Sequence, residues 1–200
     1  MSNDPAIDRA SLLALQRGDT SELNRIIARW RRPLFGFAYR YVQNTADAED
    51  LVAETLARMY AERYRLREGS NLSAWLFTTL TNLCHNHHRW KRRHPAVSLD
   101  EAQDGSEAAP ATYQELHGTE GRPDSELANN EMLAALRKAV DALPHELKAT
   151  ILLHHYEQLS YREIAGITGC SERGVETRLY RARQRLRQDL AAFLGEVSPC

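Results

Sequence analysis

The feature that most constrains the fold is the stretch SYREIAGITGCSERGVETRLYRARQRLRQDL, which spans residues 160–190. Ser160 and Glu163 have the spacing of a capping box, in which a hydroxyl and a carboxylate satisfy free amide groups of a helix's first turn. Gly169 provides the permissive backbone that a tight turn needs, and Ser171 is a suitable cap for the helix that follows. The pattern therefore predicts two helices joined by a turn.

The second of these helices has an arginine-rich outer side. Val175 and Leu179 lie four residues apart and predict the side that packs on the core. In a helix-turn-helix, the N-terminal part of the second helix enters the major groove of DNA. Arginine suits guanine edges and phosphates, and glutamate accepts a hydrogen bond from cytosine N4. The residues expected to face outward and contact bases are Arg173, Glu176 and Thr177, and those expected to contact phosphates are Arg178, Arg181 and Arg183.

The net charge of -1 hides an uneven distribution along the chain. Residues 98–126 carry eight acidic side chains and one arginine, which gives -7 and leaves +6 for the rest. This segment is rich in Pro, Gly, Ser and Ala, as is typical of a flexible linker. No run of alternating β-branched residues indicates a strand. We therefore predict an all-α protein with two small helical domains, residues 10–94 and 126–194, joined by a flexible acidic linker over residues 95–125.

Two helices are predicted from periodicity in the first domain. Over residues 44–63, Val52, Leu56 and Met59 recur at helical spacing, and acidic residues occupy the opposite face. Over residues 72–93, leucines form an apolar stripe, and a different face is polar and basic. The stripe consists of Leu72, Leu76, Leu80 and Leu83, and the other face of Thr78, Asn82, Asn86, Arg89 and Arg93, with Trp75 at its edge.

The second domain is expected to begin with two helices ahead of the helix-turn-helix. The stretch NNEMLAALRKAVDALP is amphipathic and ends near Pro144. A further helix is predicted over PHELKATILLHHYEQ, because a proline in the first turn of a helix loses no hydrogen bond.

Several classes of protein are disfavoured by what the sequence lacks. No apolar run reaches the ~20 residues of a membrane helix, and no basic-then-apolar signal pattern is present, so we expect a cytoplasmic protein without membrane contact. Cys84, Cys170 and Cys200 are scattered and predict reduced thiols. Zinc takes about four ligands. Cys84 and His88 alone are a weak pair, so we expect Cys84 in the core and no metal or cofactor.

Four segments carry a resemblance to a known family: NTADAEDLVAETLARMY and GSNLSAWLFTTLTNLCHNHHRWKRR in the first domain, and LPHELKATILLHHYEQLS and LSYREIAGITGCSERGVETRLYRARQRLR in the second. The chain resembles the extracytoplasmic-function sigma factors of bacteria, which belong to the sigma-70 family. The first pair of segments is similar to the region 2 helix that docks on RNA polymerase and to the next segment, which grips the -10 promoter element. The second pair is similar to the helix entering region 4 and to its helix-turn-helix.

This resemblance implies a transcription initiation factor with no catalytic activity of its own. It implies binding to core RNA polymerase, through the coiled coil of the largest subunit and the flap, and to promoter DNA. It further implies a role in stress responses and an anti-sigma factor as a partner. Region 4 would read the -35 element as duplex, and region 2 would capture the unpaired -10 strand, for which cationic and flat side chains are suited.

The resemblance assigns residues to these three surfaces. The -35 surface would contain Ser171, Glu172, Arg173, Glu176, Thr177, Arg178, Arg181 and Arg183. The -10 surface would contain Asn71, Leu72, Ser73, Trp75, Asn82, Asn86, Arg89, Arg92 and Arg93, with the Asn71–Ser73 loop as the pocket for a flipped base. Polymerase docking would use Asp47, Asp50, Leu51 and Glu54.

Competing interpretations remain at this point. The charged faces can be solvated helix surfaces, and Trp75 can be an ordinary core residue. A repressor or activator would use the helix-turn-helix alone, often as a dimer, but gives no reason for a second basic domain. An enzyme is disfavoured because no Walker loop or nucleophile elbow is present. Within the recognition helix, Arg173-Gly174 replaces the family's usual Gly-Thr, and Glu176 stands where lysine is common, so no -35 sequence is predicted.

Overall fold

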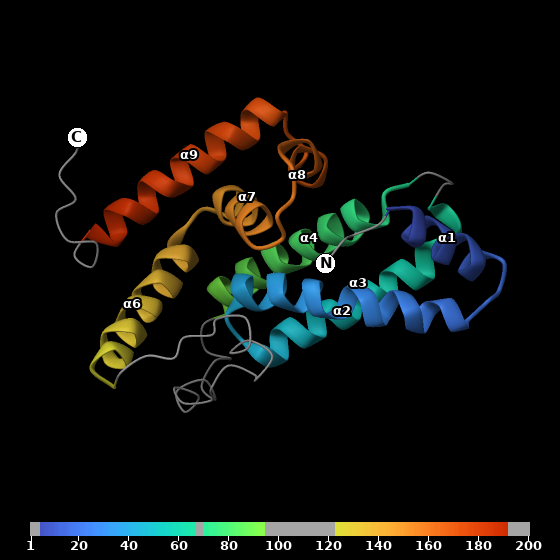
Figure 1. The fold of residues 1–200 in the computed structure, drawn as a ribbon, viewed down its shortest axis with the longest axis horizontal. Coiled ribbons are helices and arrows are strands. Elements are labelled where there is room, and N and C mark those ends of the chain that lie inside the picture. Colours follow the sequence, from blue (N-terminus) through green and yellow to red (C-terminus); the bar gives the residue numbers. More distant parts are fainter. Residues whose placement is uncertain (1–4, 67–69, 95–122, 192–200) are drawn as a thin grey trace.

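The computed structural model describes residues 5–66, 70–94 and 123–191, with side chains from residue 130 onward in the last range. Every regular element in these ranges is helical, which confirms the predicted all-α class (Figure 1). The predicted linker lies outside the described residues as far as residue 122. The elements are α1 (Pro5–Gln16), α2 (Ser21–Val42), α3 (Thr45–Glu62), a 3-10 turn (Arg63–Arg65), α4 (Leu72–Arg93), α6 (Pro123–Ala142), α7 (His145–His155), α8 (Tyr161–Thr168) and α9 (Glu172–Asp189).

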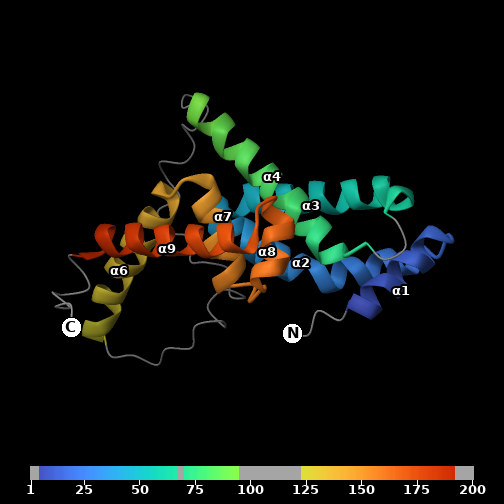
Figure 2. The same ribbon diagram turned by 90° about the horizontal axis from the view of Figure 1, so that it is seen from above.

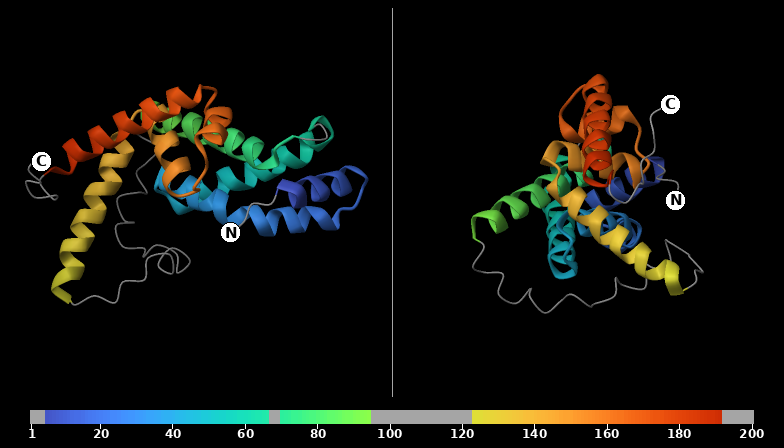
Figure 3. Two further views of the ribbon diagram at one scale, coloured as in Figure 1. Left: turned by 45° about the horizontal axis from the view of Figure 1, so that its top comes forward. Right: turned by 90° about the vertical axis from the view of Figure 1, so that its left-hand side faces the viewer.

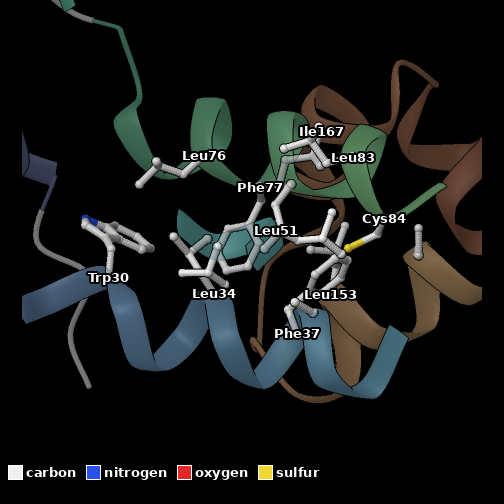
Figure 4. Close-up of a cluster of buried hydrophobic side chains, with 14 of the residues drawn as sticks. Trp30, Leu34, Phe37, Leu51, Leu76, Phe77, Leu83, Cys84, Leu153 and Ile167 are labelled. Carbon is white, nitrogen blue, oxygen red and sulfur yellow. The ribbon is translucent and has the colours of Figure 1, made fainter. Parts of the chain in front are cut away.

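The helices α2, α3 and α4 form the centre of the first body. Large aromatic side chains fill the space between α2 and α4, as Figure 4 shows. The ring of Phe77 from α4 makes edge-to-face contacts with two α2 rings, with centroid distances of 6.1 Å to Trp30 and 5.7 Å to Phe37. Edge-to-face pairs of this kind add to the stabilisation that burial alone provides.

The helix α1 is fastened to this core by polar contacts that the sequence did not predict. Asp8 is buried, accepts a hydrogen bond from the indole N–H of Trp30 at 3.2 Å and pairs with Arg29 at 2.5 Å. A buried carboxylate is tolerated only with such partners. At the other end of α1, the Gln16 amide donates to the carbonyl of Leu66 at 2.8 Å.

Both helices predicted in the first domain are confirmed, with bounds within one residue of those expected. Asn44 caps α3, and its side chain accepts a hydrogen bond from the backbone N–H of Asp47 at 2.9 Å. The four leucines of the α4 stripe are all buried. Leu51 is also buried, at 6% exposure. Its predicted role as a docking contact is therefore wrong, because it lies on the same side of α3 as Val52 and points into the core.

The helix-turn-helix is confirmed in its local details. The hydroxyl of Ser160 accepts from the backbone N–H of Glu163, and the carboxylate of Glu163 accepts from the backbone N–H of Ser160 at 2.8 Å. Gly169 ends α8 in the left-handed region, at φ 64°. Ser171 caps α9 by accepting from the N–H of Gly174 at 3.1 Å. The sequence signals and the structure agree because all of them are local.

The two bodies pack against each other and share one hydrophobic cluster, which the sequence did not predict. Leu153 from α7 and Ile167 from α8 lie among side chains of α2, α3 and α4 (Figure 4). Two hydrogen bonds accompany this packing. The Thr78 hydroxyl donates to the carbonyl oxygen of Ile167 at 3.4 Å, and the Gln43 amide donates to the carbonyl oxygen of Arg137 at 2.8 Å. In contrast, α6 extends away from the other helices (Figure 3).

A polar cluster of the buried Tyr41 and two half-buried histidines lies at this junction. The Tyr41 hydroxyl is 2.5 Å from Nδ1 of His145, whose ring lies 3.8 Å from that of His85, centroid to centroid. Burial raises the pKa of Tyr41 and, together with nearby cationic and histidine groups, lowers the pKa of His145 to about 4. Near neutral pH, Tyr41 therefore keeps its proton and the imidazole is uncharged, so the hydrogen bond joins two neutral groups.

The turn after α7 contains a carboxyl group with a shifted titration. Burial raises the pKa of Glu157 from 4.5 to about 7, although the charge of Arg40 acts in the opposite direction. A raised pKa in the folded state means that Glu157 contributes stability below about pH 4.5, and that this contribution is lost as the pH rises to about 7.

We therefore expect Glu157→Gln to gain stability relative to the wild type as the pH rises from 5 to 8. The reason is that the variant has no charge to bury at pH 8. Urea unfolding of both proteins at the two pH values measures this, and an equal difference in free energy at both would contradict it. Burial lowers the pKa of His145 from 6.5 to about 4, so this histidine affects stability within that pH range. His145→Gln is therefore a control that should change the free energy of unfolding at acidic pH and not between pH 7 and 8.

Candidate nucleic-acid interface

The outer face of α9 displays the residues predicted to contact bases. Arg173, Glu176 and Thr177 are exposed and occupy the first turns of the helix. The Thr177 hydroxyl donates to the carbonyl of Arg173 at 2.9 Å, so its oxygen can accept a further hydrogen bond. The phosphate candidates Arg181 and Arg183 are also exposed, as is Glu172. Ser171 is exposed too, but its hydroxyl is already used as the cap of α9.

Arg178 does not belong to this outer face, which corrects the sequence prediction. Its side chain is 20% exposed and lies 3.3 Å from the carboxylate of Glu146 at the start of α7. The physical reason is the position of α7, which α9 crosses on the side that also buries Val175 and Leu179. A residue three positions after Val175 lies at the edge of the buried side. The spacing of Arg178 from Val175 therefore indicated a partly buried position, whereas its being an arginine favoured an exposed one.

Tyr180 is a further exposed residue of α9 that the sequence analysis did not name. Its ring is 63% exposed, and its hydroxyl accepts a hydrogen bond from the Gln184 amide at 2.8 Å. Tyr180 borders an open groove of about 520 Å³ between α9 and the start of α7. The groove is lined by Pro144, Glu146, Leu147, Tyr180, Arg181, Gln184 and Arg185. Sequence reasoning missed Tyr180 because it weighed the arginines of this helix and not its aromatic residue.

A second polar surface runs along α4. Asn82, Asn86, Arg89 and Arg93 are exposed, and their spacing of three or four residues places them on one side of the helix. Arg92 is exposed near the same end. Figure 2 shows that this end of α4 projects beyond the other helices. Trp75 is half-buried and packs against the hydrophobic cluster, so only part of its ring is accessible beside the stripe.

The predicted Asn71–Ser73 loop is instead the beginning of α4. The Asn71 side chain caps the helix by accepting from the backbone N–H of Ala74 at 3.0 Å. Leu72 is 2% exposed and belongs to the core, so its side chain is not available to a base. Asn71 is exposed and Ser73 is half-buried. The helix predicted over residues 72–93 already began at Leu72, so the new observation is the capping role of Asn71, and a contact of Asn71 or Ser73 with a flipped base stays a prediction.

The acidic face of α3 is divided into two parts. Asp50 and Glu54 are exposed, and Glu54 pairs with Arg58 one turn later at 2.5 Å. Asp47 is half-buried and lies 2.7 Å from the ammonium of Lys91 and 3.2 Å from Nε2 of His87. Asp47 therefore links α3 to α4, and only the other two carboxylates are displayed for an external partner.

The cysteines and histidines form no recognisable centre in the parts of the chain that the structure describes. Cys84 is fully buried, as predicted for a core residue, and burial raises the pKa of its thiol, which keeps it protonated. Among the described side chains, no three His, Cys, Asp or Glu residues are grouped as a metal site requires. Within the same ranges, no helix has the length and apolar character needed to cross a membrane.

Comparisons with known proteins agree with this arrangement. Residues 26–94 match the family model of Sigma-70 region 2, and residues 133–186 match that of Sigma-70, region 4. The RNA polymerase sigma-H factor of Pseudomonas aeruginosa is 25% identical over 192 residues, which cover 95% of this chain and 97% of that protein. The ECF RNA polymerase sigma factor SigE of Mycolicibacterium smegmatis is 31% identical, over 82% of this chain and 60% of that protein.

A solved structure shows a related fold. It contains the sigma factor RpoE of Bartonella quintana in complex with the anti-sigma factor NepR. The likeness has a TM-score of 0.58 at 28% sequence identity, and covers 84% of this chain and 96% of that chain. With both region models matched in order, the chain belongs to the sigma-70 family and is a transcription initiation sigma factor of the extracytoplasmic-function type.

Proposed function

We propose that this sigma factor brings core RNA polymerase to promoters by reading -35 duplex with α9 and capturing the unpaired -10 strand with α4. The observation that carries the proposal is that two different polar surfaces are exposed on one chain. The first is the outer face of a helix-turn-helix, and the second is a stripe of amides and arginines along α4. Neither surface is used to bury the hydrophobic cluster.

The α9 surface suits duplex DNA. The N-terminal half of the second helix in such a motif enters the major groove, and Arg173 and Glu176 lie there with complementary hydrogen-bonding groups. Arg181 and Arg183 follow further along the helix, where they can contact phosphates. Phosphate contacts fix the position of the protein, whereas base contacts specify the sequence.

The α4 surface suits an unpaired strand. The amide groups of Asn82 and Asn86 can bond to exposed base edges, and Arg89 and Arg93 provide positive charge beside the backbone. The closed promoter has no unpaired strand to bind. Binding to that strand therefore stabilises the open promoter relative to the closed one. The proposed contribution to opening is therefore a shift in population, without covalent chemistry by this chain.

Docking on the polymerase is assigned to the exposed part of the acidic α3 face. We expect Asp50→Arg to weaken binding to core polymerase by about tenfold or more, because like charges then meet across the interface. Asp50 is exposed, so the fold should be unaffected. The measurement is the dissociation constant for purified core polymerase. Glu131→Arg makes the same charge change on α6 and should bind as the wild type does. Equal binding by Asp50→Arg would remove this assignment.

An anti-sigma factor is the expected regulatory partner. The supporting observation is that the RpoE structure similar to this chain is a complex with such a protein. Action in the cytoplasm, where this partner would meet polymerase and DNA, is part of the same proposal.

A further inference from the structure

The C-terminal end of α4 carries part of the proposed -10 surface without support from the core. Cys84 is the last residue of this helix with a buried side chain, and α4 continues over residues 85–93. At 1.5 Å per residue, the helix extends about 14 Å beyond Cys84. Figure 2 shows this end projecting past the other helices. Its direction therefore has to be fixed by something other than hydrophobic packing.

The projecting end of α4 is attached to α3 through Asp47. The carboxylate of Asp47 lies 2.7 Å from the ammonium of Lys91 and 3.2 Å from Nε2 of His87. These two partners are four residues apart, so a single carboxylate holds two successive turns of α4. Asp47 is itself held in place, because its backbone N–H donates to the Asn44 side chain at the start of α3. An attachment that spans one turn limits both the tilt and the rotation of the helix end.

Asp47 contacts the side of α4 that is turned away from the proposed -10 surface. With 3.6 residues per turn, Asn86, Arg89 and Arg93 lie within about 60° of one another around the helix. Lys91 lies roughly opposite them on the same helical wheel. A carboxylate beside the DNA backbone would repel its phosphates, whereas one on the far side of the helix does not compete with the strand. Asp47 can therefore orient the surface without touching the strand.

A second contact of the same segment depends on the other body. The ring of His85 lies 3.8 Å from that of His145 on α7, centroid to centroid. Because α7 belongs to the second body, this contact exists only while the two bodies are packed together. The Asp47 contact lies within the first body and persists whatever position the second body takes.

We propose that Asp47 is a positioning residue for capture of the unpaired -10 strand. By holding Lys91 and His87, it keeps the projecting end of α4 in the direction that presents Arg89 and Arg93 to the strand. This inference rests on the proposed function of α4 and names the residue that orients its surface. It also reverses the usual effect of charge. Loss of an acidic residue near a DNA-binding surface normally strengthens binding to DNA, whereas loss of Asp47 weakens it.

The test compares Asp47→Asn with Glu49→Gln in the complete chain bound to core polymerase. Both substitutions remove one negative charge near the start of α3, and Glu49 is exposed. Asp47→Asn is expected to weaken binding of a fluorescein-labelled single-stranded DNA about fivefold, the upper range for a partly exposed ion pair. Glu49→Gln should bind this strand at least as tightly as the wild type, and Asp47→Glu, which keeps the charge, should retain most of the affinity. Equal affinities of Asp47→Asn and Glu49→Gln would overturn the positioning role.

Two measurements show whether Asp47 acts through the end of α4. Hydrogen exchange of the backbone amides of residues 88–93 should be faster in Asp47→Asn, while exchange in residues 76–84 stays unchanged. In a background that carries Lys91→Met, Asp47→Asn should weaken strand binding by less than it does in the wild type. Unchanged exchange at the helix end, or an equal effect in both backgrounds, contradicts the inference.

Failure of this inference is distinguishable from failure of the proposed function. If Asn86→Ala weakens binding of the single strand and Asp47→Asn does not, α4 captures the strand without this attachment. If the wild-type complex has no affinity for the strand, the proposed function of α4 is wrong, and the positioning role with it. The affinity of Asp47→Asn for core polymerase should equal that of the wild type. A loss confined to polymerase binding would make Asp47 a docking residue instead.

Discussion

Reversing two arginines on the outer face of α9, in the double variant Arg173→Glu with Arg181→Glu, is expected to weaken binding to promoter duplex by about 100-fold. Arg173 lies where the helix would meet base edges, and Arg181 lies two turns later, where it would meet phosphate. Both side chains are exposed, so the substitutions remove no packing from the core. The effect should therefore appear in DNA binding and leave the free energy of unfolding unchanged.

The measurement is the dissociation constant of the polymerase complex for duplex DNA at several salt concentrations. The logarithm of the affinity should also depend less steeply on salt, by about one unit of slope for each phosphate that the variant can no longer bind. A matched control is Arg17→Glu with Arg65→Glu, which makes the same charge change at exposed sites of the first body. If both double variants lose affinity equally, the effect is one of total charge, and α9 is not the contact surface.

The largest effect on stability is expected at Lys148, a cation buried where the two bodies meet. Lys148 is 1% exposed, its ammonium lies 2.7 Å from the carboxylate of Asp141, and it is 4.6 Å from the centre of the Tyr41 ring. Lys148→Ala removes a long, fully enclosed side chain and leaves a cavity, so we expect a loss of about 2–4 kcal/mol in the free energy of unfolding.

Two further substitutions separate the roles of volume and charge at this site. Lys148→Met keeps the length of the side chain without its charge, and should stay within about 1.5 kcal/mol of the wild type. Asp141→Asn keeps the charge of Lys148 and removes its counter-ion, and should lower the free energy of unfolding by about 1–3 kcal/mol. Urea unfolding measures all three. If Lys148→Met is as unstable as Lys148→Ala, the ion pair stabilises the junction and the packing explanation is wrong.

The helix-turn-helix and α4 were predictable because their signals lie within a few residues of each other. The Ser160–Glu163 capping box, the left-handed Gly169 and the leucine stripe of α4 follow from local geometry, and the structure contains all of them. The acidic linker over residues 95–125 stays a prediction up to residue 122, where the chain lies outside the described residues, whereas its last three residues already belong to α6 (Pro123–Ala142).

What could not be predicted depends on contacts between segments far apart in the sequence. Nothing in the stretch HELK indicates that Lys148 is buried, because its partner Tyr41 comes from α2. Likewise, Asp47 has the appearance of a free surface carboxylate until the fold places Lys91 of α4 beside it. The errors at Arg178 and Leu51 have a different origin. In both cases the helical spacing indicated the buried side of the helix. The prediction instead followed the residue type at Arg178 and the family position at Leu51.

The most direct test of the proposed function is run-off transcription with purified core polymerase on a pooled library of genomic promoters, with and without this protein. We predict new discrete start sites that depend on the added protein, disappear with Asp50→Arg and disappear with the double reversal on α9. These start sites would also define the promoter sequence that the chain recognises. If no transcripts are added although the folded protein binds duplex DNA without polymerase, the proposal of a promoter-directing subunit is contradicted, and the helix-turn-helix belongs to an ordinary repressor or activator.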